Sequence, residues 1–486
     1  MSESNKLLCG TVVLTVGRVA GYSLSFLRNL ILARILAKAD YGLAAVLGMA
    51  MTLLEISGRM AFGMQVVQSK QGDTLRFQAC AHALQFIGGL CSALLIAGLS
   101  IPMARLFGVG HAWRAFALLA IVPLCQGLSH LDVSRRQRAL DFLPLMMVDV
   151  VPQLLITIAA WPLAVWLRDY RVIVWLMVGK ALLGTAMTFA FAQRPYRWSW
   201  EREYLRNMLS FGWPLLLTGL AMFGSQQADQ MIIGAVFSLD LLASYALAYS
   251  IVSIPWFIFS QVGASLMLPL LARVQDDSVG LCRQYRLCLQ TAASIGVIFY
   301  LPLTVSGEQL VTLLFGAKYE GAGVFVAVLG AVFAVRFLRF SASYAAAAKA
   351  DTINQLYSYL WRGISLPLAL GVVAVGGNPL QIAGCAVVGE ILAAVYSLFR
   401  LQWRQGVSFR ESYTASIYLC TWVTLGVGFA LLGGAHLHFG WVVLVAIGAT
   451  LIAIGAAWFM FPEVFRLVIH AVRRDLTLKV EQPVTL

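Results

Sequence analysis

A chain of 486 residues with 60% apolar and 12% charged residues cannot be a set of soluble domains, because soluble globular proteins carry roughly 25% charged residues. The apolar residues gather in stretches of about 20, the length at which a helix crosses the roughly 30 Å hydrocarbon core of a membrane. An outer-membrane barrel is excluded, because its strands would read as alternating segments of about ten residues. The sequence therefore predicts an all-α polytopic membrane protein.

In chain order, the sequence predicts about fourteen membrane-spanning helices, the first of which is expected to remain in the mature chain. Their expected ranges are 8–33, 42–64, 78–101, 113–133, 142–165, 172–192, 211–235, 243–267, 289–306, 321–344, 356–375, 381–399, 413–433 and 441–461. An even number places both termini on one side of the membrane. Lys and Arg number 21 on that side and 7 in the opposite loops, so the positive-inside rule predicts cytoplasmic termini. The net charge of +13 therefore reflects topology, and no nucleic-acid partner is expected.

The segments between the predicted spans are too short to fold into a catalytic domain. None of the seven lysines is followed by Ser or Thr, which excludes a Walker A phosphate loop and ATP-driven transport by this chain alone. A membrane enzyme would need acidic residues on a sizeable outer loop, but Asp169, Asp240, Glu308 and Glu320 are scattered over separate turns. The sequence predicts that the protein is not an enzyme and has no resident cofactor or metal.

Two segments that lie 201 residues apart resemble each other. Residues 28–45 read RNLILARILAKADYGLAA and residues 229–246 read DQMIIGAVFSLDLLASYA, each running from one span through a short turn into the next. Six spans per repeat predict two parallel bundles around a central cavity suited to alternating access. The expected domains are the six-helix bundles 1–199 and 200–400, followed by 401–486 with two further helices and a cytoplasmic tail. The alternative is that two polytopic segments look alike by chance.

Ionisable side chains within spans are costly and usually face a cavity or a partner. The bases in such positions predict a cationic substrate cavity, and they are Arg18, Arg28, Arg59, Lys180, Arg336, Arg339 and Arg362. The acids in such positions are candidates for coupling or gating, and they are Glu55, Asp149, Asp229 and Glu390. Bases exceed acids, which favours an anionic substrate.

Spacing along the helices places four of these residues in two pairs. Glu55 and Arg59 have the i,i+4 spacing of a local ion pair, so they either neutralise each other or take part in coupling. Arg336 and Arg339 share one helix face with no acid nearby in sequence. Two buried arginines need an anion, and a pyrophosphate accepts bidentate guanidinium bonds well. The alternative is that Arg339 snorkels to the headgroups.

The repeat equates Asp229 with Arg28, because the two residues occupy the same position in the two similar segments. Both lie near the predicted periplasmic ends of their spans. We therefore expect them to face each other and to close the outer side of the cavity as an ion pair. Substrate phosphates would open this gate by displacing the carboxylate from Arg28.

Several motifs, taken in order, resemble those of a known family. Ala33-Arg34-Ile35-Leu36 with Asp40-Tyr41-Gly42 resembles the turn after the first span of Wzx-like polysaccharide flippases, which belong to the multidrug/oligosaccharidyl-lipid/polysaccharide exporter superfamily. The stretch from Ser134-Arg135-Arg136-Gln137-Arg138 to Phe142 is similar to that family's basic loop after span 4. Further similar motifs are Phe211-Gly212-Trp213-Pro214, Asp229 with Ile232-Ile233-Gly234, Tyr245-Ala246-Leu247-Ala248-Tyr249, Pro269 to Arg273, and Leu314-Phe315-Gly316. The resemblance covers residues 8 to about 400 and departs from the family's usual residues at Ala39 and Ala243.

The resemblance implies a flippase that moves a polyprenyl-pyrophosphate-linked oligosaccharide from the cytoplasmic to the periplasmic leaflet of a bacterial inner membrane, for cell-surface or exopolysaccharide synthesis. Its implied partners are that substrate, membrane lipids and a polysaccharide polymerase with its chain-length machinery. Coupling to H⁺ or Na⁺ and release driven by the membrane potential both remain open. The alternative is a drug or metabolite exporter of the same superfamily, although cationic drugs should prefer an acidic cavity.

Overall fold

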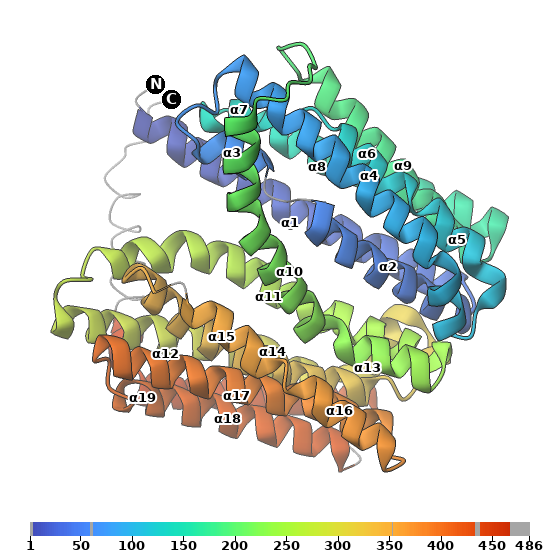
Figure 1. Ribbon diagram of the computed structural model, residues 1–486. Coiled ribbons are helices and arrows are strands. Elements are labelled where there is room, and N and C mark those ends of the chain that lie inside the picture. Colours follow the sequence, from blue (N-terminus) through green and yellow to red (C-terminus); the bar gives the residue numbers. More distant parts are fainter. Residues whose placement is uncertain (1–2, 59–61, 352, 433–437, 467–486) are drawn as a thin grey trace, which may run out of the picture. The chain divides into compact units, whose positions relative to one another are not determined.

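The protein is helical throughout the part of the chain that can be described. The computed structural model describes residues 3–58, 62–351, 353–432 and 438–466, and the regular elements in these ranges are all helices (Figure 1). Twelve of its helical segments are long and apolar enough to cross a membrane. The predicted all-α polytopic class is therefore confirmed, and the chain is a multi-pass membrane protein.

The helices follow the predicted spans closely. Those of the first half of the chain are α1 (Glu3–Ile35), α2 (Lys38–Gly58), α3 (Phe62–Gln68), α4 (Leu75–Leu106), η1 (Gly110–Ala112), α5 (Trp113–Leu118), α6 (Ile121–Leu128), α7 (Asp132–Arg138), α8 (Leu143–Leu167), α9 (Arg171–Ala190) and α10 (Arg202–Val236). The twelve spanning segments do not include α1 and α2, which cover the first two predicted spans. The total of fourteen spans stays a prediction.

The second half of the chain continues the same pattern. Its helices are α11 (Leu239–Ala272), α12 (Ser278–Val305), α13 (Gly307–Phe315), η2 (Ala317–Tyr319), α14 (Gly323–Ala348), α15 (Ile353–Arg362), α16 (Ser365–Ala374), α17 (Pro379–Gln405), α18 (Arg410–Leu431) and α19 (Phe439–Met460). α15 and α16 together form one spanning segment that is broken in the middle.

The chain divides into two compact units. The first consists of Met1–Leu247, Leu314–Tyr319 and Ala369–Pro379. The second consists of Ala248–Leu313, Glu320–Leu368 and Leu380–Leu486. The predicted domain boundaries after residues 199 and 400 stay a prediction.

In the first unit, α1 packs along α8, α8 packs against α9, and α4 packs against α6. The α4–α6 crossing is close because both helices present glycine there. A Cβ added at Gly89 would lie 2.6 Å from the carbonyl oxygen of Pro123 and 2.7 Å from Cα of Gly127. Small residues let membrane helices approach in this way when lipid gives no hydrophobic drive for their association.

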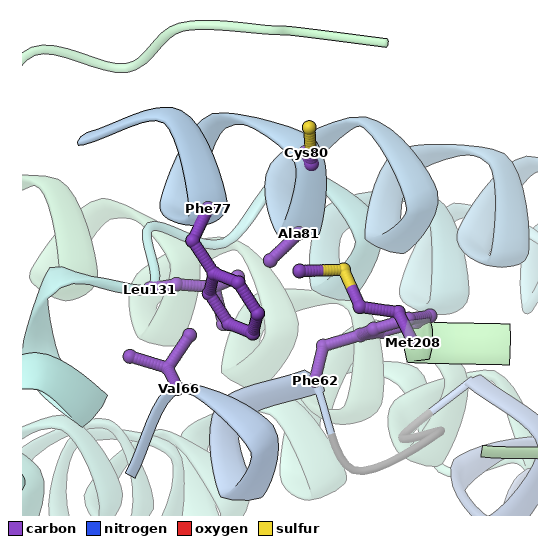
Figure 2. Close-up of a cluster of buried hydrophobic side chains, with 7 residues drawn as sticks. All are labelled: Phe62, Val66, Phe77, Cys80, Ala81, Leu131 and Met208. Atoms are coloured by element: carbon purple, nitrogen blue, oxygen red, sulfur yellow. The ribbon is translucent and has the colours of Figure 1, made fainter. Parts of the chain in front are cut away.

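One end of the first unit is held by an apolar cluster. Phe62 and Val66 of α3 meet Phe77 of α4, Leu131 just before α7, and Met208 of α10 (Figure 2). All five side chains are at most 6% exposed. The cluster joins the short helices α3 and α7 to the ends of the long helices α4 and α10.

The turn between α1 and α2 explains one of the family-like motifs. Gly42 has no room for a side chain, because a Cβ there would lie 2.0 Å from the backbone oxygen of Leu239 at the start of α11. Tyr41 meets Tyr319 edge-on at 6.3 Å between ring centroids. Lys318 Nζ donates to the carbonyls of Arg34 (3.1 Å) and Leu36 (2.6 Å), which have no helical partner at the end of α1. Close backbone packing therefore requires glycine at position 42, near the start of α2.

In the second unit, α14 is the central helix. It packs against α12 and α18, and its small and apolar residues occupy all its faces, as is typical of a buried helix. Arg336 and Arg339 lie in this buried segment and are among its buried residues. Their charges must therefore be balanced inside the protein.

Candidate functional site: a buried arginine cluster

Arg336 and Arg339 of α14 converge on a single carboxylate, that of Glu390 in α17. Arg339 Nε donates to Glu390 Oε1 at 2.7 Å, and Arg336 Nη2 donates to Oε2 at 3.2 Å. Glu390 is fully buried, and the two arginines are 3% and 5% exposed. The predicted anion for this arginine pair is thus supplied, at least in part, by the chain itself. The alternative that Arg339 snorkels to the headgroups is wrong for this structure, because its guanidinium is buried on Glu390.

Arg362, the last residue of α15, is the third base at the same carboxylate. Its Nε lies 2.8 Å from Glu390 Oε2, but the N–H is not aligned for a hydrogen bond. Its Nη1 is buried and has no hydrogen-bond acceptor among the described residues. We call Arg336, Arg339, Arg362 and Glu390 the arginine cluster. Three guanidinium groups share one carboxylate, so the cluster holds two positive charges in excess.

The cluster lies beside a break in a membrane-spanning segment. α15 ends at Arg362 and α16 begins at Ser365, because Pro367 lacks an N–H and its ring would clash with the carbonyl of Gly363 in a continuous helix. α17 passes close to this break, since a Cβ at Gly389 would lie 2.7 Å from the backbone oxygen of Arg362. Broken helices frequently form the substrate sites of membrane transporters. The break therefore places Arg362 and Glu390 where such a site is expected.

Aromatic rings surround the guanidinium groups. The Cζ of Arg336 lies 4.4 Å from the ring centroid of Phe333 and 5.6 Å from that of Trp256, and Arg339 Cζ lies 5.1 Å from that of Tyr359. Ring faces stabilise cations that have lost water. These rings were not predicted from the sequence. The spacing of Phe333 and Arg336, one turn apart on one helix, is the signal that could have found one of them.

The other predicted site residues lie apart from the arginine cluster in sequence. Arg28 Nη2 donates to Ser25 (3.4 Å) and Asn29 (3.2 Å), its neighbours on α1. Asp229 accepts hydrogen bonds from the hydroxyl of Tyr245 and from the backbone N–H of Gln230 (2.9 Å). The structure thus gives the Asp229 carboxylate a tyrosine partner, and its pairing with Arg28 stays a prediction.

The remaining predicted residues fall into two groups. The first group has exposed side chains in the first unit and consists of Arg18, Lys180 and Asp149. The predicted pair Glu55 and Arg59 lies outside what the structure describes, because the Glu55 side chain and residue 59 are not among the described parts. The roles of all five stay predictions.

The basic loop after span 4 uses its arginines internally. Arg135 Nε lies 2.5 Å from Asp132 Oδ1, Arg136 Nη2 lies 2.6 Å from Asp141 Oδ2, and Arg138 donates to the backbone at the end of α3. Burial alone would raise the pKa of Asp132, but hydrogen bonds from Arg135 and the Gln193 backbone outweigh it and lower that pKa. These bases therefore stabilise the end of the first unit through ion pairs and hydrogen bonds within it.

His130, just before α7, belongs to the same network. Its Nδ1 accepts a hydrogen bond from the backbone N–H of Asp132 (3.1 Å), which leaves Nε2 as the donor to the carbonyl of Arg194 (2.9 Å). A proton on Nδ1 would abolish the first bond. Burial lowers the pKa of His130 from its ordinary value of 6.5, although the nearby Asp132 carboxylate acts in the opposite direction.

Acid is therefore expected to destabilise the protein through His130. The unfolded chain binds a proton at the ordinary pKa, and the folded protein binds it only at lower pH, so this contribution is complete above about pH 6.5 and is lost as pH falls through the folded-state pKa. The thermal midpoint of the detergent-purified protein should fall between about pH 7.5 and about pH 5.5. His130→Gln retains an acceptor and should reduce that fall. Equal pH dependence in the two proteins would contradict the assignment.

Comparisons with known proteins agree with this fold. A family model described as "Polysaccharide biosynthesis protein" matches residues 31–323. The amylovoran biosynthesis protein AmsL of Erwinia amylovora is 24% identical over 206 residues, which are 41% of this chain and 53% of that protein. The chain thus matches only about half the length of this curated relative.

Solved structures match over most of the chain. The lipid II flippase MurJ in an inward closed conformation has a TM-score of 0.67 and 13% identity, covering 93% of this chain and 99% of that one. An inward-facing multidrug resistance transporter of the MATE family has a TM-score of 0.60 and 12% identity, covering 80% and 94%. The first of these solved structures is a flippase and the second is a transporter, and the likeness to them is one of fold.

The family model covers more than half of the chain and confirms the resemblance inferred from the ordered motifs. The structural matches add the fold, which is shared with MurJ and the MATE transporters. This chain therefore belongs to the polysaccharide biosynthesis protein family and has the fold of flippases and transporters of the multidrug/oligosaccharidyl-lipid/polysaccharide exporter superfamily.

Proposed function

We propose that this protein is a flippase that moves a polyprenyl-pyrophosphate-linked oligosaccharide from the cytoplasmic to the periplasmic leaflet of a bacterial inner membrane by alternating access. Both termini lie in the cytoplasm in this proposal, as the distribution of Lys and Arg predicts. The flipped unit then serves a polysaccharide polymerase and its chain-length machinery. The family match supports a role in polysaccharide synthesis.

The observation on which the substrate assignment depends is the charge of the arginine cluster. Its three guanidinium groups have one carboxylate, and Nη1 of Arg362 has no acceptor among the described residues. A pyrophosphate suits this deficit, because guanidinium groups bind phosphate oxygens through paired charge-assisted hydrogen bonds. The cluster is buried in this structure, so the substrate reaches it in another conformation, in which α15 has moved away from α17.

The alternative is a drug or metabolite exporter, because a multidrug transporter has the same fold. The cluster favours the flippase, because a cationic drug would meet an excess of bases there. For coupling, we propose that Glu390, Asp229, Asp149 and Glu55 are the candidate sites for H⁺ or Na⁺. Release driven by the membrane potential alone needs none of them.

Deletion of the gene in its host tests this proposal. We expect surface polysaccharide to be lost and lipid-linked repeat units to accumulate where an impermeant glycosidase or lectin cannot reach them in spheroplasts. A plasmid copy should reverse both effects. Accumulation of accessible units would instead indicate a defect after flipping, and unchanged polysaccharide with altered drug sensitivity would indicate the exporter.

A further inference from the structure

A cavity of about 560 Å³ lies at one end of the first unit, between the start of α5 and the start of α9. The polar and aromatic side chains that line it are those of His111, Trp113, Arg114, Tyr170, Arg171 and Trp175. Aliphatic side chains of α5, α8 and α9 form the rest of its wall. The cavity is remote in sequence from the arginine cluster, and neither the proposed transport nor the family motifs use these residues.

Two guanidinium groups give the cavity its chemistry. Arg114 Cζ lies 5.6 Å from the ring centroid of Trp113, and no carboxylate lies within ion-pair distance of this arginine among the described residues. Arg171 Nε lies 3.3 Å from Asp169 Oδ2, yet its side chain is 66% exposed. Guanidinium groups bind phosphate oxygens through charge-assisted hydrogen bonds, and both of these line the same cavity. Arg171 is also the first residue of α9, where the helix dipole favours a negative charge.

The position of the cavity favours a lipid over a soluble anion as its ligand. It lies at the ends of three candidate membrane spans, Gly110–Leu128, Leu143–Leu167 and Arg171–Ala190. Trp113 and Trp175 are 40% and 53% exposed there, as expected of rings at the membrane–water interface. A lipid bound at the membrane–water interface would place its polar headgroup against the arginines and its carbon chains against the aliphatic wall.

We propose that this cavity binds the headgroup of a membrane phospholipid, with the phosphodiester on Arg114 and Arg171 and the glycerol and first acyl carbons between Trp113 and Trp175. By the predicted topology, the lipid belongs to the periplasmic leaflet. Asp169, which lies within ion-pair distance of Arg171, orients that guanidinium and meets the alcohol or ammonium group of the headgroup. This site is independent of the proposed transport function.

Lipid titration of the purified full-length protein in detergent tests the site. We expect phosphatidylglycerol to raise the thermal midpoint in a saturable manner and to remain bound in native mass spectrometry. The variant Arg114→Ala with Arg171→Ala should need at least about tenfold more lipid for the same effect. Arg105→Ala removes an exposed base at the end of α4, outside the cavity lining, and should behave like the wild type.

Two ligand controls complete the test. Diacylglycerol has the chains without the phosphate, and inorganic phosphate has the anion without the chains, so neither should reproduce the effect of phosphatidylglycerol. An equal response to inorganic phosphate would make this a site for a free anion and would overturn the proposal. An equal response to diacylglycerol, or unchanged lipid binding by the double variant, would also overturn it. Trp113→Ala should weaken lipid binding as well, which provides a second variant with all charges intact.

Discussion

Glu390→Gln is expected to lower the free energy of unfolding by about 3–5 kcal/mol. Most of the folded protein should therefore be lost from membranes that express this variant. Glu390 is fully buried and is the carboxylate on which Arg336, Arg339 and Arg362 converge. A neutral amide of the same shape would leave three buried guanidinium groups without an anion. Breaking a buried ion pair costs this much because the remaining charge is neither hydrated nor compensated by an opposite charge.

Two further substitutions serve as controls for Glu390→Gln, one within the arginine cluster and one on the surface. Arg362→Gln leaves Glu390 with Arg336 and Arg339, so we expect a much smaller loss of stability than in Glu390→Gln. Glu320→Gln alters an exposed acid of the same unit and should stay within about 0.5 kcal/mol of the wild type. Abundance in membranes and the thermal midpoint in detergent measure these differences. Glu390→Gln as stable as the surface control would refute a structural role for the carboxylate.

Arg362→Ala is expected to lower glycan export at least about 100-fold while the protein remains near its normal abundance. Arg362 is the cluster member whose Nη1 has no acceptor among the described residues, so it has hydrogen-bonding capacity left for a phosphate. Its removal leaves no unpaired carboxylate, because Arg336 and Arg339 both donate to Glu390. The loss should therefore appear in transport rather than in folding.

Two further variants separate charge from geometry. Arg362→Lys keeps the charge and should rescue export only partly, because an ammonium cannot reproduce the two-donor fork of a guanidinium. Arg404→Ala removes an exposed base from the last turn of α17 and should export normally. Normal export by Arg362→Ala at equal abundance would mean that the arginine cluster does not bind the substrate.

Hydropathy predicted most of the fold because a membrane fixes the length and polarity of each span. The helices follow the predicted ranges, including the long α14 and α17 that hold Arg336, Arg339 and Glu390. The break between α15 and α16 was not predicted, although Pro367 indicates a kink. Whether a proline bends or breaks a helix depends on its neighbours, and here Gly389 of α17 packs directly against the break.

The site was predicted in part. The i,i+3 spacing of Arg336 and Arg339 correctly placed them on one buried face and required an anion. It could not identify Glu390, which is 51 residues from Arg339 and reaches it only through helix packing. The rings of Trp256 and Tyr359 were missed for the same reason, since they come from other helices. The pairing of Arg28 with Asp229 depended on an internal repeat and stays a prediction, and the structure shows a hydrogen bond from the Tyr245 hydroxyl to Asp229.

Reconstitution into liposomes tests whether this protein flips a lipid-linked oligosaccharide. Purified protein is placed in liposomes with a labelled polyprenyl-pyrophosphate oligosaccharide in both leaflets, and the fraction that an impermeant glycosidase can cleave is measured over time. We predict that the wild type brings the inner-leaflet substrate to the outer surface, that Arg362→Ala does so no faster than protein-free liposomes, and that Arg404→Ala matches the wild type. Wild-type protein, folded and correctly inserted, that leaves the inner pool protected under an imposed ion gradient or membrane potential would contradict the flippase assignment.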